Sequence, residues 1–294
     1  MIARIVLIII TTLLAAGCAG DGAGEKGTEV VAAFYPLAYA AERVGGAEVD
    51  VRNLTPPGAE PHDVELTARD VERVRQADIV LYLGDGFQPA LEDAVADAEG
   101  EAVDLLGGLR LLRGEAHDEH AADHEEESGV DPHVWLDPLR YATIVERIGR
   151  DLDRAEAAGA VVRELRKLDR DFRLGLADCD RRELVTSHAA FSYLAQRYRL
   201  RQISISGLSP ESEPTPRELE EIIEHVEEAG AGTIFFETLV SPRIAETVAR
   251  ETGAETAVLN PLEGLTEEEL ESGANYFTVM RRNLAALRAA LGCR

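Results

Sequence analysis

The stretch IVLYL at residues 79–83, followed by PALEDAVADA at 89–98 and AVDL at 102–105, decides the fold class. The first and last of these segments are short and mostly apolar, and a segment of helical length lies between them. Apolar strands that alternate with helices are typical of a parallel sheet that helices cover on both faces. The sequence therefore predicts an α/β fold.

The same alternation extends along most of the chain. Further strands are expected at 30–34, 49–54, 183–187, 202–205, 233–236 and 256–259, and further helices at 37–44, 67–76, 191–198, 217–229, 241–253 and 276–291. Residues 138–178 are expected to be mostly helical, with a weak point at Ala157-Ala158-Gly159. We therefore expect two lobes, each a mostly parallel sheet flanked by helices, joined by a long connecting helix.

These elements divide the chain into five parts. We expect a lipoprotein signal peptide at 1–18, a flexible tether at 19–28, an N-terminal α/β lobe at 29–137 with a histidine-rich loop at 114–129, a connecting helical segment at 138–180, and a C-terminal α/β lobe at 181–294.

The first residues predict export. Arg4 is followed by an apolar run too short to span a bilayer comfortably, and then by Gly17-Cys18, as in a signal peptide. Residues 14–18, LAAGC, resemble a bacterial lipobox, in which the cysteine is lipidated. We expect Cys18 to anchor the protein to the cell membrane. An ordinary secretory signal with a chance cysteine is the alternative, and it too predicts export, to the periplasm.

Composition limits the partners. The chain has 55 acidic and 30 basic residues and a formal net charge of -25, so its surface should repel nucleic acid and attract cations. Exposed carboxylates do not by themselves make a metal site. Two further cysteines, Cys179 and Cys293, could persist as a disulfide outside the cytoplasm.

Three of the seven histidines occupy positions suited to a shared site. His62 follows the second expected strand, His188 follows the strand at 183–187, and His133 lies in DPHVWLDP at 131–138, which two prolines stiffen. Open parallel sheets bind ligands beyond the carboxyl ends of their strands. A fourth zinc ligand would have to come from NPLE at 260–263, where Glu263 offers a carboxylate and Asn260 only a weak amide oxygen.

The remaining histidines carry weaker predictions. His117, His120 and His124 alternate with carboxylates in the loop at 114–129, and such tracts can bind metals loosely. A solvated acidic loop with incidental histidines is the alternative. His225 is expected at the surface of a helix.

Four motifs together resemble those of one family. PGAEPHD at 57–63, DPHVWL at 131–136, TSHAAF at 186–191 and NPLEGL at 260–265 look like the zinc-binding solute-binding proteins of ABC importers, the ZnuA-like members of the cluster A-I metal-binding lipoproteins. The resemblance covers essentially the whole mature chain, in order. It implies two lobes with a metal between them, held by His62, His133 and His188.

The resemblance leaves the fourth ligand open. In the family this position is a carboxylate or a water, and Asn260 stands where manganese-type relatives tend to place an aspartate. Glu263 or a water is therefore expected here. Manganese-type relatives also tend to carry a carboxylate at the position of His188, and imidazole donors suit zinc. Zinc-type relatives often carry a histidine-rich loop at the same place.

The function that follows is binding without catalysis. We expect an extracytoplasmic monomer that captures Zn²⁺, undergoes only small lobe movements, and delivers the ion to the membrane permease subunit of an ABC importer. Because histidines must be neutral to bind metal, affinity should fall below about pH 6. The alternatives are a manganese or iron carrier of the same family, an exported zinc hydrolase with Glu60 or Glu263 as its base, and a metal-stabilised adhesin.

Overall fold

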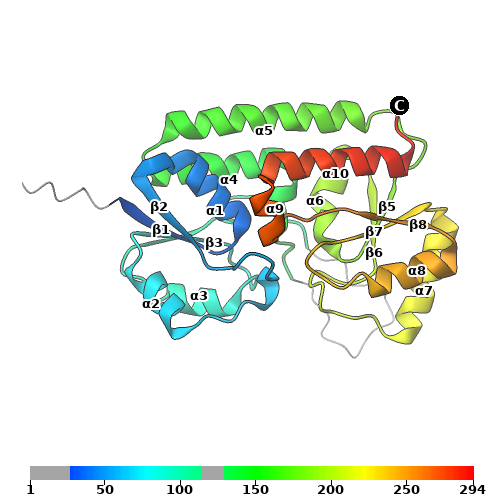
Figure 1. Cartoon of the computed structure of the whole chain (residues 1–294), viewed down its shortest axis with the longest axis horizontal. Coiled ribbons are helices and arrows are strands. Elements are labelled where there is room, and N and C mark those ends of the chain that lie inside the picture. Colours follow the sequence, from blue (N-terminus) through cyan, green and yellow to red (C-terminus); the bar gives the residue numbers. More distant parts are fainter. Residues whose placement is uncertain (1–26, 114–128) are drawn as a thin grey trace, which may run out of the picture.

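The computed structural model describes residues 27–113 and 129–294, which form two parallel four-stranded sheets (Figure 1). The first has the order β2-β1-β3-β4 and the second the order β6-β5-β7-β8, and every neighbouring pair is parallel. The strands are β1 (Thr28–Ala32), β2 (Val49–Asn53), β3 (Ile79–Tyr82), β4 (Glu101–Asp104), β5 (Glu183–Thr186), β6 (Arg201–Ser204), β7 (Thr233–Phe236) and β8 (Glu255–Val258). The predicted α/β class with two parallel sheets is confirmed.

Helices flank both sheets. We call the first sheet with α1 (Tyr35–Gly45), α2 (Ala68–Gln76) and α3 (Pro89–Val95) the N-terminal lobe, and the second sheet with α6 (Ser192–Tyr198), α7 (Pro216–Ala229) and α8 (Arg243–Thr252) the C-terminal lobe. Local sequence fixes the starts of two of these helices, because Thr67 with Asp70 and Thr215 with Glu218 form capping boxes. The short helix α9 (Glu267–Glu271), capped by Thr266, was not predicted because five mostly acidic residues show no apolar periodicity.

The chain passes between the lobes through two helices, and the second of them is the long connecting helix. They are α4 (Pro138–Asp151) and α5 (Ala155–Gly175), and the turn between them includes Asp153 in the left-handed region (φ 55°). The predicted weak point at residues 157–159 is wrong, because these residues lie inside α5. A Cβ on Gly149 of α4 would come within 2.3 Å of the Cβ of Ala158, so small side chains here serve close helix packing.

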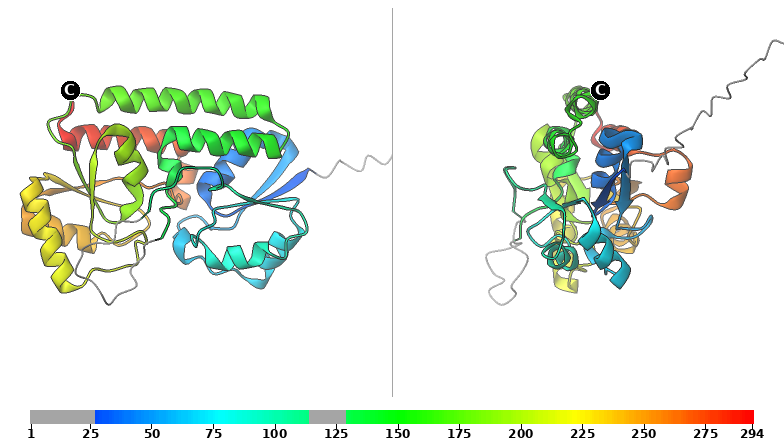
Figure 2. Two further views of the ribbon diagram at one scale, coloured as in Figure 1. Left: turned by 180° about the vertical axis from the view of Figure 1, so that it is seen from behind. Right: turned by 90° about the vertical axis from the view of Figure 1, so that its left-hand side faces the viewer.

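Helix α5 is the element that runs past both lobes. Its 21 residues span roughly 30 Å at 1.5 Å per residue. Figures 1 and 2 show α5 along one edge of the molecule, with the last helix, α10 (Tyr276–Leu291), beside it. A disulfide between Cys179 and Cys293 joins the segment after α5 to the segment after α10. Within the described ranges, no helix is both long and apolar enough to cross a membrane.

The larger hydrophobic core is shared between the lobes. It continues from the N-terminal sheet through α4, α5 and α10 to α6, whereas a smaller cluster lies between the C-terminal sheet and helices α7 and α8. Close-packed interiors resist sliding. A shared core of this kind favours limited movement between the lobes.

Candidate metal centre

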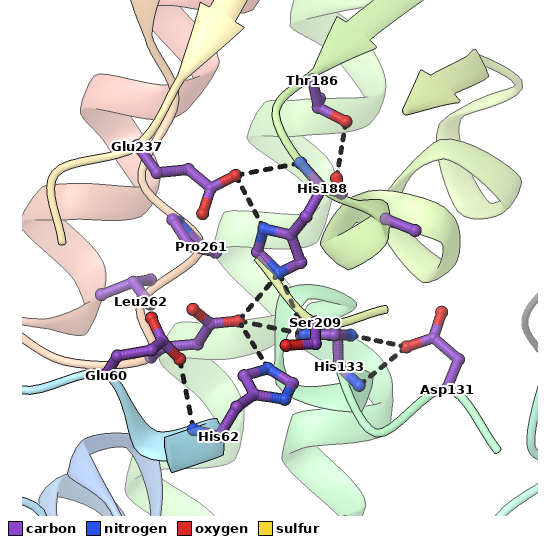
Figure 3. Close-up of polar contacts among 12 residues, drawn as sticks. Glu60, His62, Asp131, His133, Thr186, His188, Ser209, Glu237, Pro261 and Leu262 are labelled. Carbon is purple, nitrogen blue, oxygen red and sulfur yellow. Dashed lines mark hydrogen bonds and ion pairs between the residues drawn. The ribbon is translucent and has the colours of Figure 1, made fainter. Parts of the chain in front are cut away.

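Four side chains from distant parts of the chain meet between the lobes. One donor atom from each of His62, His133, His188 and Glu263 lies within 4.8 Å of the others. In Figure 3 the three imidazole rings point toward one another. His62 lies in the 3₁₀ turn η2 (Pro61–Asp63) after β2, His133 directly precedes η3 (Val134–Leu136), His188 follows β5, and Glu263 follows β8. The carboxyl ends of both sheets therefore contribute to one site.

The spacing of the donor atoms suits a tetrahedral ion. Glu263 Oε1 lies 3.0 Å from His133 Nε2, 3.2 Å from His188 Nε2 and 3.5 Å from His62 Nε2. The Nε2 atoms of His133 and His188 are 3.3 Å apart. Zinc bonds of about 2.0–2.1 Å in tetrahedral geometry place ligand atoms roughly 3.3–3.5 Å apart. Small adjustments of these side chains would complete such a coordination sphere.

Buried carboxylates orient two of the histidines. Nδ1 of His133 lies 2.8 Å from Asp131 Oδ1, and Nδ1 of His188 lies 2.7 Å from Glu237 Oε1. An imidazole that donates through Nδ1–H presents the lone pair of Nε2 to a metal. Sequence reasoning missed both carboxylates. Glu237 directly follows β7, so the strand-end rule that identified His188 could also have identified it.

The turn before Glu263 explains why the glutamate, and not Asn260, faces the centre. Asn260 Oδ1 accepts a hydrogen bond from the backbone N–H of Leu262 at 2.7 Å, and its Nδ2 donates to Thr238 Oγ1 at 3.0 Å. Leu262 adopts φ 60°, a left-handed conformation that turns the chain sharply. The Asn260 amide therefore shapes the loop, and Glu263 supplies the oxygen at the centre.

The site carries opposed charges in a buried setting. Burial opposes ionisation of Glu263, but the charge of His188 and hydrogen bonds from the histidines hold its pKa well below its usual value. Burial likewise works against protonation of His188, yet the charges of Glu237 and Glu263 raise its pKa well above the usual range. Burial lowers the pKa of His62. For Glu60, burial and then the charge of Glu263 raise the pKa to about 9.

Some buried polar atoms here lack a hydrogen-bond partner. They are His62 Nε2, Glu60 Oε2, Glu263 Oε2 and Asp131 Oδ2; the 3.5 Å approach of His62 Nε2 to Glu263 Oε1 is a contact and does not meet hydrogen-bond geometry. An unsatisfied buried polar atom costs about 1–3 kcal/mol. A bound cation would give His62 Nε2 a partner, so the residues fit a metal ion.

The other candidate residues do not join this centre. His225 is exposed on α7. Cys18, His117, His120 and His124 lie outside the described residues. Three nitrogens and one carboxylate oxygen make a closed four-donor set, which is typical of sites that hold an ion.

Known proteins resemble this chain along most of its length. The family model described as "Zinc-uptake complex component A periplasmic" (ZnuA) matches residues 30–290. The "Zinc-binding protein AdcA" of Streptococcus pyogenes serotype M3 is 36% identical over 288 residues, which cover 90% of this chain and 56% of AdcA. The chain thus spans about half the length of this relative.

Two further relatives match over nearly their whole length. The "High-affinity zinc uptake system protein ZnuA" of Bacillus subtilis is 33% identical, covering 95% of this chain and 94% of the relative. The structure of the laminin binding protein Lmb of Streptococcus agalactiae, described as a bifunctional protein with adhesin and metal transporting activity, superposes with a TM-score of 0.79 at 31% identity, covering 90% of this chain and 100% of Lmb. The chain therefore belongs to the ZnuA family, described as zinc-uptake complex component A, periplasmic.

Proposed function

We propose that this protein captures Zn²⁺ outside the cytoplasm and delivers it to the membrane permease of an ABC importer. The observation that carries this proposal is the meeting of three imidazole Nε2 atoms and one carboxylate oxygen from both lobes around one buried point. His62, His133, His188 and Glu263 would be the ligands. The names of the AdcA and ZnuA relatives support zinc as the cargo.

The donor chemistry also favours zinc over manganese. Imidazole suits zinc, whereas manganese prefers oxygen ligands. Three of the four donors here are nitrogens, and two of them are supported by buried carboxylates. An ion held between the lobes would link occupancy to their relative position, which a permease could detect. The shared core favours small movements as the signal.

Binding without catalysis fits the closed donor set. A catalytic zinc site keeps one position for water or substrate. In this site Glu263 Oε1 would fill the fourth position, since it lies within 3.5 Å of all three Nε2 atoms. Cys18 would supply a lipid anchor, the loop histidines would collect zinc weakly, and the chain would act as a monomer.

The proposal is tested by metal competition. Purified protein should retain Zn²⁺ when Mn²⁺ is in excess, and His188→Ala should lose most of its zinc affinity. His225→Ala is the matched control, because it removes an exposed histidine that lies outside the centre. Preference for Mn²⁺, or full zinc retention by His188→Ala, would refute the assignment. Hydrolysis of ester or peptide substrates by the zinc-loaded protein would favour the hydrolase alternative instead.

A further inference from the structure

Trp135 joins segments on both sides of the metal centre. It is the only tryptophan in the chain, it is fully buried, and it lies two residues after His133. Its ring packs edge-on against Phe34 of the N-terminal lobe, with ring centroids 4.8 Å apart. Its polar atoms bind the segment that follows the C-terminal sheet: Nε1 donates to the backbone oxygen of Pro261 at 2.7 Å, and the backbone oxygen accepts from Tyr276 Oη at 2.7 Å.

These contacts reach the loop that carries Glu263 directly. Pro261 lies two residues before Glu263, so the bond from Trp135 fixes the start of the turn that presents the carboxylate. From the other side, Asn283 of α10 holds Asn260 by two hydrogen bonds, of 3.1 Å to its N–H and 2.7 Å to its carbonyl. The loop that carries Glu263 is therefore held from both α10 and the N-terminal lobe.

We propose that Trp135 is a positioning residue that holds the Glu263 loop against His133 and slows opening of the lobes around the ion. The proposal rests on the proposed function, zinc capture at this centre. The hydrogen bonds of Trp135 need no ion, so they order the Glu263 loop before the metal arrives. Preorganisation of this kind strengthens binding. For the loop to move away from His133, the bond from Trp135 to Pro261 must break, and movement of α10 together with the loop must also break the bond from Tyr276 to Trp135.

A pair of buried tyrosines supplies a matched test. The rings of Tyr276 and Tyr141 stack with centroids 4.4 Å apart, and both side chains are fully buried. Each hydroxyl donates to one backbone oxygen: Tyr276 to Trp135 at 2.7 Å, and Tyr141 of α4 to Pro36 of α1 at 2.6 Å. Tyr276→Phe and Tyr141→Phe thus remove similar bonds, but only the first bond reaches Trp135.

The readout is the rate at which Zn²⁺ leaves the loaded protein, measured by stopped-flow trapping with a chelator. Tyr276→Phe should release Zn²⁺ about five- to tenfold faster than the wild type, as expected for one lost buried hydrogen bond. Tyr141→Phe should release it at the wild-type rate, although both variants lose similar thermal stability. Trp135→Phe, which keeps a ring but loses Nε1–H, should also release Zn²⁺ faster than the wild type. It replaces Tyr276→Phe as the test variant if Tyr276→Phe does not fold.

The outcomes separate this proposal from the proposed function. Faster release from Tyr276→Phe or Trp135→Phe, but not from Tyr141→Phe, supports the positioning role. If the wild type binds Zn²⁺ and the variants release it at equal rates, the role of Trp135 is overturned while the transport proposal stands. A wild type that binds no Zn²⁺ overturns the transport proposal itself.

Discussion

Replacing Glu237 by glutamine should weaken zinc binding although it removes none of the four donor atoms. Glu237 Oε1 accepts from Nδ1 of His188 at 2.7 Å and from its backbone N–H at 3.3 Å, and the residue is 3% exposed. The carboxylate keeps the proton on Nδ1 and increases the donor strength of Nε2. A glutamine keeps the shape of the side chain but loses the charge.

The size of the effect follows from the change in hydrogen bond. A bond to a charged group contributes about 1.5–3 kcal/mol and a neutral bond about 0.5–1.5 kcal/mol, so the substitution loses roughly 1–1.5 kcal/mol. This corresponds to a zinc affinity about five- to tenfold lower. Glu237→Ala, which leaves Nδ1 of His188 without this partner, should lose about 10- to 100-fold.

Affinity is measured by competition with a chromophoric chelator at neutral pH. Glu224→Gln is the control, because Glu224 is exposed on α7 and its replacement changes the net charge equally. Equal affinities for Glu237→Gln and Glu224→Gln would refute the reasoning, since the contact with His188 would then add nothing beyond long-range charge.

Three further predictions concern the carboxylate of Glu263, the protons released on zinc binding, and the disulfide. Glu263→Gln should lower zinc affinity in the same competition assay by more than Glu237→Ala does, and a smaller loss would indicate water as the fourth ligand. In the metal-free protein the pKa of His188 is raised, so its contribution to folding stability is complete below about pH 6.5 and is lost as the pH rises through the raised pKa. Zinc binds the neutral imidazole, so zinc binding should release protons. Zinc affinity should therefore increase as the pH rises. Calorimetry in buffers of different ionisation enthalpy measures this release, and identical heats would contradict it. Replacing both Cys179 and Cys293 by serine should lower the free energy of unfolding in urea by about 2–4 kcal/mol. Zinc affinity should persist in that variant, because neither cysteine is among the donors, and its loss would assign the disulfide a role in shaping the site.

Local signals in the sequence were sufficient for most of the fold. The helix expected at 217–229 is observed as α7 with its start one residue earlier, and the apolar run at 233–236 predicted β7 with its observed bounds. The same reasoning failed at Ala157-Ala158-Gly159, where small residues mark close contact with α4. A composition that suggests a weak helix can equally serve tight packing, and only the neighbouring element distinguishes the two.

The sequence by itself determined that histidines stand at the carboxyl ends of strands in an α/β chain, because strand periodicity and turn residues are local properties. It left open whether Asn260 or Glu263 faces the centre, since an irregular loop has no repeating pattern that fixes the direction of a side chain. Tertiary structure decided that choice through the left-handed turn at Leu262 and the hydrogen bonds of Asn260. It also decided that Glu237 orients His188, because these residues lie 49 positions apart and meet only when β5 pairs with β7. The contact of Asp131 with His133 is local in the chain, but no repeating pattern in the sequence indicates that the two side chains face each other.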